Sequence, residues 1–234
     1  MIENENLHLH RDVSTLLDTS DMIEKKLNEI DALQRMIYDN QSNLSDLISR
    51  AAMLIANLNK NKGMLYATGN GGAMATASHL VAELSGRFKY ENTTVPASTL
   101  GADAALTTAL GNDYQSFDGI LMREVAAKVR EGDIFVGLTT SGSFNILQAA
   151  AEALERNVSV ILLIGNKEDN KQVNFETRIR QRVVGGIYKE MVVIPCYGFT
   201  YTPIIQEYHM MIVHLICEMV DEILVNGGRV HEEG

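Results

Sequence analysis

Two stretches near the N-terminus carry apolar residues at helical spacing, after a first segment without a regular pattern. Residues 1–19 show no sustained period and are predicted to form a flexible tail. Within residues 20–60, apolar positions recur every three or four residues on either side of a polar break at 40–43. They are Ile23, Leu27, Ile30, Leu33 and Ile37, then Leu44, Leu47, Ile48, Ala51, Leu54, Ile55 and Leu58. We predict two amphipathic N-terminal helices that cover a sheet face or a neighbouring subunit.

Beyond residue 60, short apolar runs alternate with helical patterns. The runs of strand length occupy 64–68, 94–99, 134–139, 158–164 and 191–195. The helical patterns occupy 73–84, 115–129, 144–157 and 203–225. This alternation is typical of a doubly wound α/β fold with a mostly parallel sheet, in which ligands bind beyond the carboxyl ends of the strands. Residues 61–230 are therefore predicted to form one five-stranded α/β domain. The polar segment 166–189 is interpreted as a mobile loop or an excursion over the site.

Charge and composition exclude several classes of function. The chain has 20 Lys and Arg against 30 Asp and Glu, a formal net charge of −10. It lacks the basic clusters that bind nucleic acid or an anionic membrane, so neither is an expected partner. Because its apolar runs are only strand-length, we predict no transmembrane helix or secretory signal and expect a cytoplasmic protein. Cys196 and Cys217 form no metal or redox motif and are interpreted as buried thiols.

Two turns at predicted strand ends are suited to an anionic group. Gly69-Asn70-Gly71-Gly72 leads from the first strand into a helix, which places backbone N–H groups and a helix N-terminus beyond the strand. Its spacing matches neither a dinucleotide fingerprint nor a Walker loop, which disfavours NAD and ATP. The third strand ends in Thr139-Thr140-Ser141-Gly142-Ser143. These hydroxyls would either hold a phosphate or cap the following helix.

Polar residues on two predicted helices indicate a possible metal site. His79 and Glu83 are four residues apart and share a helix face, so they form either half of a site for a divalent metal such as zinc or a surface polar pair. The apolar final helix is interrupted by Gln206, Glu207, His209 and His214. Polar groups buried in such a helix are costly without partners, and the face that carries His79 and Glu83 could supply them.

A third polar group follows the second predicted strand. Asp103 would cap a helix, and Asn112-Asp113 would form a turn, or these side chains would bind sugar hydroxyls at the strand-end rim.

Taken in order, the motifs resemble those of the phosphoheptose isomerases, a family with the sugar isomerase (SIS) fold. The matching segments are Gly69-Asn70-Gly71-Gly72, the run from His79 through Glu83 to Arg87-Phe88, Leu100 to Asp103, Gly111-Asn112-Asp113, Thr139 to Gly142, and Ile205-Gln206-Glu207-Tyr208-His209 with His214. The resemblance spans residues 44–225 and implies a flavodoxin-like three-layer sandwich. It also implies a homotetramer that acts on a small sugar phosphate, namely the isomerisation of sedoheptulose 7-phosphate to D-glycero-D-manno-heptose 7-phosphate.

The resemblance assigns roles to residues by position. Glu83 and His214 match the acid/base pair, which would move the carbonyl through an enediol(ate). The implied ligands of one Zn²⁺ per site are His79, Glu83, Gln206 and His214. The implied substrate contacts are Asn70, Gly71, Gly72, Glu83, Asn112, Asp113, Thr139, Thr140, Ser141 and Gln206. A bound metal would polarise the reacting oxygen.

Four positions depart from the family pattern, and they leave alternatives open. Ala73 and Thr76 stand where Ser and Asp are usual, Phe144 where a phosphate-binding Ser is usual, and Pro203 where an Asp is usual. An isomerase of another long-chain ketose phosphate is therefore one alternative. A non-catalytic SIS-domain scaffold or regulator, like the replication-initiator-associating relative, is another, although Glu83 and His214 favour an enzyme.

The spacing of two implied metal ligands predicts an active site shared between subunits. Gln206 and His214 are eight residues apart on one predicted helix, so their backbones lie about 12 Å apart along its axis. Ligand atoms of one zinc ion lie within about 2.0–2.2 Å of it. A second copy of the helix would supply one ligand with less strain.

Overall fold

The computed structural model describes residues 19–91, 93–114, 117–165, 189–196 and 198–229. The chain divides into two compact units, Met1–Asp39 and Asn40–Gly234. In the first unit, the helix α1 (Thr19–Asp39) carries the predicted apolar stripe, and Leu33 is buried. Apart from Thr19, the predicted tail lies outside the described residues, as does nearly all of the segment 166–189. The three-part division of the chain made from the sequence stays a prediction.

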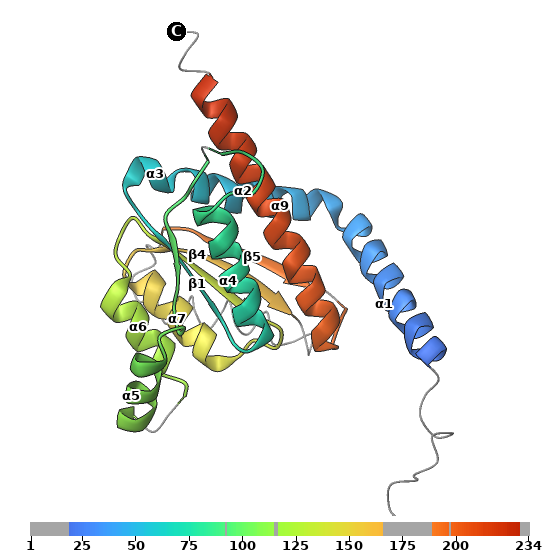
Figure 1. Cartoon of the computed structure of the whole chain (residues 1–234), viewed down its shortest axis with the longest axis horizontal. Coiled ribbons are helices and arrows are strands. Elements are labelled where there is room, and N and C mark those ends of the chain that lie inside the picture. The colour runs from blue at the N-terminus through green and yellow to red at the C-terminus, as the bar shows by residue number, and fades with distance from the viewer. Residues whose placement is uncertain (1–18, 92, 115–116, 166–188, 197, 230–234) are drawn as a thin grey trace, which may run out of the picture. The chain divides into compact units, whose positions relative to one another are not determined.

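The second unit is an α/β domain whose elements alternate as predicted (Figure 1). They are α2 (Gln41–Ala56), α3 (Leu58–Asn61), β1 (Leu65–Gly69), α4 (Gly72–Ser85), β2 (Ala97–Thr99), α5 (Ala104–Tyr114), α6 (Ile120–Lys128), β3 (Ile134–Thr139), α7 (Phe144–Glu155), β4 (Ser159–Gly165), β5 (Met191–Cys196) and α9 (Thr202–Arg229). The five strands lie in the order β2-β1-β3-β4-β5, and every neighbouring pair is parallel. The doubly wound, five-stranded sheet is therefore confirmed.

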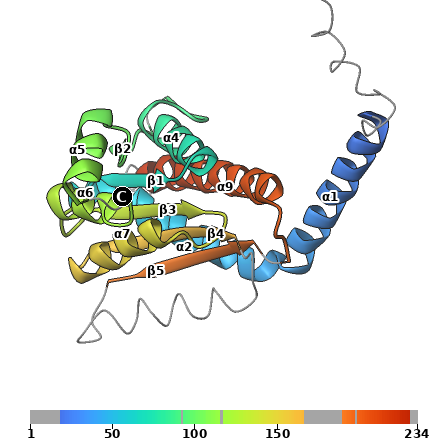
Figure 2. The same cartoon turned by 90° about the horizontal axis from the view of Figure 1, so that it is seen from below.

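Helices cover both faces of the sheet. On one face α7 packs against β3 and β4, and α6 packs against α7. On the other face α4 packs against β1 and β2, α2 against β5, and α9 against both α2 and α4. In both views α4 and α9 run side by side (Figure 2). None of the helices in the described part of the chain has the length and apolar run needed to span a membrane.

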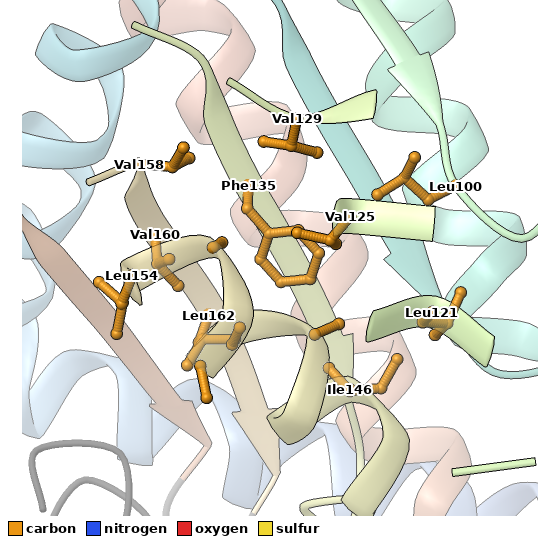
Figure 3. Packing of buried hydrophobic residues seen from close by; sticks show 14 of the residues in the cluster. Leu100, Leu121, Val125, Val129, Phe135, Ile146, Leu154, Val158, Val160 and Leu162 are labelled. Carbon is orange, nitrogen blue, oxygen red and sulfur yellow. The ribbon is translucent and has the colours of Figure 1, made fainter. Parts of the chain in front are cut away.

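The core beneath α6 and α7 explains why the central strands are apolar along their whole length. All residues of β3 and β4 are buried. Figure 3 shows Phe135 of β3 among Val125 of α6, Ile146 of α7 and Leu162 of β4, and all four are fully buried. Burying such side chains contributes roughly 1.5–3 kcal/mol each. A strand covered on both faces loses the apolar–polar alternation, and this is the pattern of 134–139 and 158–164.

The segment between β2 and β3 differs from the prediction. The expected helix over 115–129 is shorter, α6, and a separate helix, α5, precedes it. Asp103 begins α5, because its Oδ1 accepts the N–H groups of Ala105 at 3.0 Å and Leu106 at 3.1 Å. Asn112 and Asp113 lie in the last turn of α5, so their interpretation as a loop turn is wrong. Because α5 buries only Leu110, it lacks the apolar stripe that marks a helix in a sequence.

The two cysteines are buried, as expected, on β5 and α9. Burial raises the pKa of Cys196 and of Cys217 to about 12. Both therefore stay thiols near neutral pH, and a thiol is neither a nucleophile nor a metal ligand.

Candidate active site

The turn after β1 is held in shape by a glycine and by a pair of amides. Gly71 precedes α4 with a φ of 53°, a left-handed conformation that favours glycine. Asn70 and Asn145 exchange two hydrogen bonds, each amide nitrogen donating to the other amide oxygen at 2.9 Å. Asn145, in the first turn of α7, is 3% exposed. The Asn70 side chain is therefore fixed at the carboxyl end of the sheet by a residue that sequence reasoning missed.

The loop after β3 gathers three hydroxyls at the start of α7. The Oγ1 of Thr139 accepts the N–H of Ser143 at 2.9 Å, so this buried hydroxyl holds the loop together. The hydroxyls of Ser141 and Ser143 lie 3.4 Å apart. Ser143 is the N-cap residue of α7 but makes no side-chain cap hydrogen bond. The hydroxyls of Ser141 and Ser143 therefore lie at a helix N-terminus, where N–H groups without helical partners favour an anion.

The first turn of α9 meets both loops. A Cβ at Gly72 would lie 2.3 Å from Nε2 of Gln206, so this amide lies directly over the N-terminus of α4. A Cβ at Gly165, the last residue of β4, would lie 2.5 Å from the carbonyl oxygen of Thr140 and 2.6 Å from Cγ2 of Ile205. The carboxyl ends of β1, β3 and β4 are thereby joined to α9. The structure thus brings together the predicted substrate contacts on these loops and Gln206. We call this group the loop cluster, and its members are Asn70, Gly71, Gly72, Thr139, Thr140, Ser141 and Gln206.

The predicted acid and base residues meet farther along the same two helices. Nε2 of His79 lies 3.0 Å from Nε2 of His214 and 3.3 Å from Oε1 of Glu83. The two imidazole rings meet edge to face, with centroids 5.1 Å apart. The side chains of His79 and Glu83 are 36% and 23% exposed. We call these three residues the acid/base cluster, and it lies at the surface of this chain.

The two clusters lie at different levels along the parallel helices α4 and α9. Gly72 faces Gln206 near the start of the helices, and His79 faces His214 two turns later. With eight residues between them on α9, Gln206 and His214 are about 12 Å apart along the axis. Within one chain, Gln206 therefore contacts Gly72, whereas His79 contacts both of the other predicted metal ligands, Glu83 and His214.

The chemistry of the acid/base cluster fits a divalent metal, but its arrangement in one chain is incomplete. Two imidazole nitrogens and a carboxylate oxygen are donors that zinc accepts. The imidazole of His79 lies 3.0 Å from that of His214 and 3.3 Å from the Glu83 carboxylate, so the three side chains gather in one place. Among the described residues of this single chain, however, no group of three or more His, Cys, Asp or Glu side chains is arranged to hold an ion.

Asn112 and Asp113 are not joined to either cluster. Both are exposed, and Nδ2 of Asn112 donates a hydrogen bond to Oδ1 of Asp113 at 3.4 Å. In one chain the structure thus leaves these two predicted substrate contacts apart from the other candidates.

The polar residues of α9 have more than one environment, contrary to the single counterpart expected from the sequence. His214 contacts His79 at the surface. His209 is 1% exposed, and neither ring nitrogen has a hydrogen-bond partner among the described residues. Burial lowers its pKa from the ordinary value of 6.5 to about 3. His209 is therefore a neutral imidazole inside the protein at physiological pH.

Comparisons with known proteins place this chain among sugar-phosphate isomerases. A family profile described as the SIS domain matches residues 27–165. The phosphoheptose isomerase of Geotalea daltonii is 36% identical over 208 residues, which cover 87% of this chain and 97% of that relative. The phosphoheptose isomerase of Citrifermentans bemidjiense is 38% identical over 190 residues, which cover 80% and 90%.

Solved structures agree with the sequence comparisons. The structure of a phosphoheptose isomerase from Neisseria gonorrhoeae matches with a TM-score of 0.68 at 30% identity, covering 86% of this chain and 99% of that one. A phosphoheptose isomerase from Francisella tularensis matches with a TM-score of 0.64 at 29% identity, covering 84% and 98%. The resemblance inferred from the motifs and the expected fold are confirmed.

Proposed function

Because the chain belongs to the phosphoheptose isomerase family of SIS-domain enzymes, we propose that it converts sedoheptulose 7-phosphate to D-glycero-D-manno-heptose 7-phosphate. The observation that carries this proposal is the acid/base cluster, in which Glu83, His79 and His214 form a chain of contacts at 3.3 and 3.0 Å. A carboxylate and an imidazole within reach of each other are the groups that move protons in such an isomerisation.

The proposed reaction moves the carbonyl from C2 to C1 of the sugar. Glu83 removes a proton from C1, and the electron pair forms the C1–C2 double bond of an enediol(ate) while O2 gains a proton. His214 serves as the acid, and His79 lies between the two, 3.3 Å from Glu83 and 3.0 Å from His214. Return of a proton to C2 and loss of the O1 proton complete the aldose.

The loop cluster is the proposed grip on the substrate. The hydroxyls of Ser141 and Ser143 and the free N–H groups at the start of α7 would bind the phosphate. Asn70 and Gln206 would bind sugar hydroxyls, together with Thr140 and the backbone of Gly71 and Gly72. Holding the phosphate remotely keeps the reacting carbons in register with the acid and base.

A divalent metal fits the same proposal. His79, Glu83 and His214 would hold one Zn²⁺ with Gln206 as a further ligand, and the bound ion would supply Lewis-acid polarisation of the reacting oxygen.

We further propose that each active site combines residues of two subunits in a homotetramer. Two features support this proposal. Gln206 lies about 12 Å along α9 from His214, and Asn112 and Asp113 have no described contact with either cluster of their own chain. In addition, α9 exposes Leu215, the residue after His214, at 40% and Met219, about one turn farther along, at 38%, and these apolar side chains are suited to packing against a partner helix.

Turnover tests the activity. The purified protein is incubated with sedoheptulose 7-phosphate, and formation of the aldose is followed with and without a chelator. Loss of turnover in the chelator and recovery with Zn²⁺ are expected. If the protein turns over only another ketose phosphate, the proposed substrate is wrong. If the zinc-loaded protein turns over no ketose phosphate, a non-catalytic regulator is favoured.

Mixed oligomers test the shared site. A Glu83→Gln chain and a Gln206→Ala chain, each inactive alone, are unfolded together and reassembled. If Glu83 of one subunit works with Gln206 of another, some sites receive both native residues and activity returns. If both residues come from one chain, no hybrid site is intact and activity stays absent.

A further inference from the structure

An aromatic ring lies against the imidazole of the proposed acid. The ring of Phe88 is stacked on His214, with centroids 6.0 Å apart and an interplanar angle of 26°. Nε2 of His214 meets His79 at 3.0 Å. The exposed His214 side chain is thus held by one neighbour at an edge and by another at a face. Neither the sequence patterns nor the proposed chemistry gives a role to Phe88.

Phe88 lies in the irregular segment that connects α4 to β2, and a buried carboxylate fixes that segment. Oδ2 of Asp221 accepts the backbone N–H of Lys89 at 2.8 Å and that of Tyr90 at 3.2 Å. Asp221 is 4% exposed. A buried carboxylate that accepts two N–H groups is a strong and specific anchor, because hydrogen bonds to a charged acceptor are roughly twice as strong as neutral ones.

The next residue of α9 adds a second attachment. Oε1 of Glu222 accepts hydrogen bonds from Nζ of Lys89 at 2.7 Å and from the hydroxyl of Tyr90 at 3.0 Å. The hydrogen bond that Lys89 donates to Glu222 raises the pKa of Lys89. These side chains are more exposed than Asp221, so this second attachment is weaker.

The anchor and the imidazole belong to one helix face. Asp221 follows His214 by seven residues on α9, and residues seven apart lie nearly in line on a helix. We propose that Asp221 and Phe88 are positioning residues for His214: Asp221 fixes the backbone beside Phe88, and the Phe88 ring fixes the plane of the imidazole. This inference rests on the proposed role of His214.

Kinetics of three variants test the role of the ring. Phe88→Leu keeps an apolar side chain but removes the aromatic face, so kcat is expected to fall about 3- to 10-fold, from the worth of an aromatic pair. KM should change by less than about twofold, since binding is left intact. Phe88→Tyr restores the aromatic face and should restore kcat. Tyr38→Leu, an aromatic-to-leucine change at a residue 77% exposed on α1, is the control for a general effect of the substitution.

A double-mutant cycle separates positioning from a merely structural effect. In a His214→Gln background, Phe88→Leu should have almost no further effect on the residual rate, because the group that it positions is gone. An equal loss of kcat in both backgrounds would overturn the inference. For the anchor, Asp221→Asn keeps an oxygen acceptor and should preserve kcat better than Asp221→Ala. Equal activity of these two folded variants would exclude Asp221 as the anchor.

Nuclear magnetic resonance of the histidine rings gives a readout that does not depend on turnover. The ring signals of His214 are assigned by their loss in His214→Gln in the full-length, zinc-loaded protein. Ring-current shifts from Phe88 should be present in the parent and in Phe88→Tyr and absent in Phe88→Leu. Signals unchanged by Phe88→Leu would overturn the contact itself. If Phe88→Leu changes the shifts but His214→Gln leaves the rate unchanged, the contact is correct and the proposed function of His214 is wrong.

Discussion

The two ends of the α4–α9 helix pair differ in how completely one chain builds them. At the loop end, Gly72 admits the amide of Gln206, and Asn145 pairs with Asn70 through two hydrogen bonds. At the other end, His79 contacts both Glu83 and His214 at the surface. The proposed substrate-binding groups are therefore fixed in place by the fold, whereas the proposed acid/base groups are partly exposed.

This difference has a physical explanation. A site that binds phosphate and hydroxyls gains affinity when its donors are fixed before the ligand arrives. A site that carries out proton transfer must exclude water, and an exposed cluster on one chain does not do so. A second subunit that covers His214 and the exposed Leu215 and Met219 of the same helix would close it. The comparison thus supports the proposal that assembly with a second subunit completes the acid/base end of the site.

The largest effect is expected at the open end. Glu83→Gln keeps the volume of the side chain and removes the base, so kcat should fall by about 10²- to 10⁴-fold. The fold should be unchanged, because Glu83 is partly exposed and its described partner is the neighbouring His79. Steady-state kinetics and thermal unfolding measure the two effects.

Glu91→Gln is the matched control for this change. Glu91 forms an exposed ion pair with Arg87, and its side chain is 75% exposed. Such pairs contribute about 0–1 kcal/mol, so neither rate nor stability should change much. If Glu83→Gln kept a rate within a few-fold of the parent, Glu83 could not be the base.

Two glycines at the loop end give the next largest effect and distinguish packing from binding. A Cβ at Gly69 would lie 2.6 Å from the backbone of Ala73, so Gly69→Ala forces the start of α4 to shift. Overpacking of this kind costs about 1–3 kcal/mol of stability. A Cβ at Gly72 instead meets the flexible end of Gln206.

Gly72→Ala should therefore displace Gln206 at little cost in stability, since alanine is also about 1 kcal/mol better than glycine in a helix. Its loss of kcat/KM should approach that of Gln206→Ala. Denaturant unfolding and kinetics of both glycine variants measure the difference. Equal destabilisation by the two substitutions would show that the amide of Gln206 is as rigid as the backbone of Ala73.

The sequence predicted the sheet more accurately than the contacts between its ends. β3 and β4 are recognisable because every residue in them is buried, so their apolar runs are unbroken. The pair His79 and Glu83 is recognisable because a spacing of four places both on one helix face. These signals are local, because each can be interpreted within the single helix or strand that carries it.

The missed features depend on residues far apart in the chain. Asn145 pairs with Asn70 across 75 positions, and Phe88 meets His214 only because α9 runs beside α4. Nothing in the sequence fixes how far α9 slides along α4, and this register decides that Gln206 faces Gly72 while His214 faces His79. A polar residue in the first turn of a largely apolar helix, such as Asn145, was the one signal that a closer inspection could have used.

His209 lies between the two ends of α9 and should make stability depend on pH. Its folded pKa is lowered to about 3 from 6.5, so below pH 6.5 the unfolded chain binds a proton that the folded protein excludes. The contribution of neutral His209 to the free energy of unfolding is fully present above pH 6.5, and it falls with decreasing pH by up to about 1.4 kcal/mol per pH unit. Between pH 7.5 and 5 the loss should be about 2 kcal/mol. In His209→Leu, denaturant unfolding should show a loss smaller by about that amount, and parallel pH profiles of the two proteins would contradict it.

The smallest effect is expected from restoring a hydroxyl at the loop end. Phe144 is the first residue of α7 and is 52% exposed, where related enzymes are expected to have a phosphate-binding serine. A neutral hydrogen bond contributes about 0.5–1.5 kcal/mol, so Phe144→Ser should tighten the apparent affinity for the sugar phosphate by no more than about tenfold. The gain should be at the low end of this range, because the neighbouring Ser143 already brings a hydroxyl within 3.4 Å of that of Ser141.

Phe144→Ala is the control, since it removes the ring without adding a donor. Titration with the sugar phosphate measures both variants. An unchanged affinity in Phe144→Ser would place residue 144 outside the phosphate site, and equal gains in both variants would mean that the ring obstructs the site and that no hydroxyl is missing.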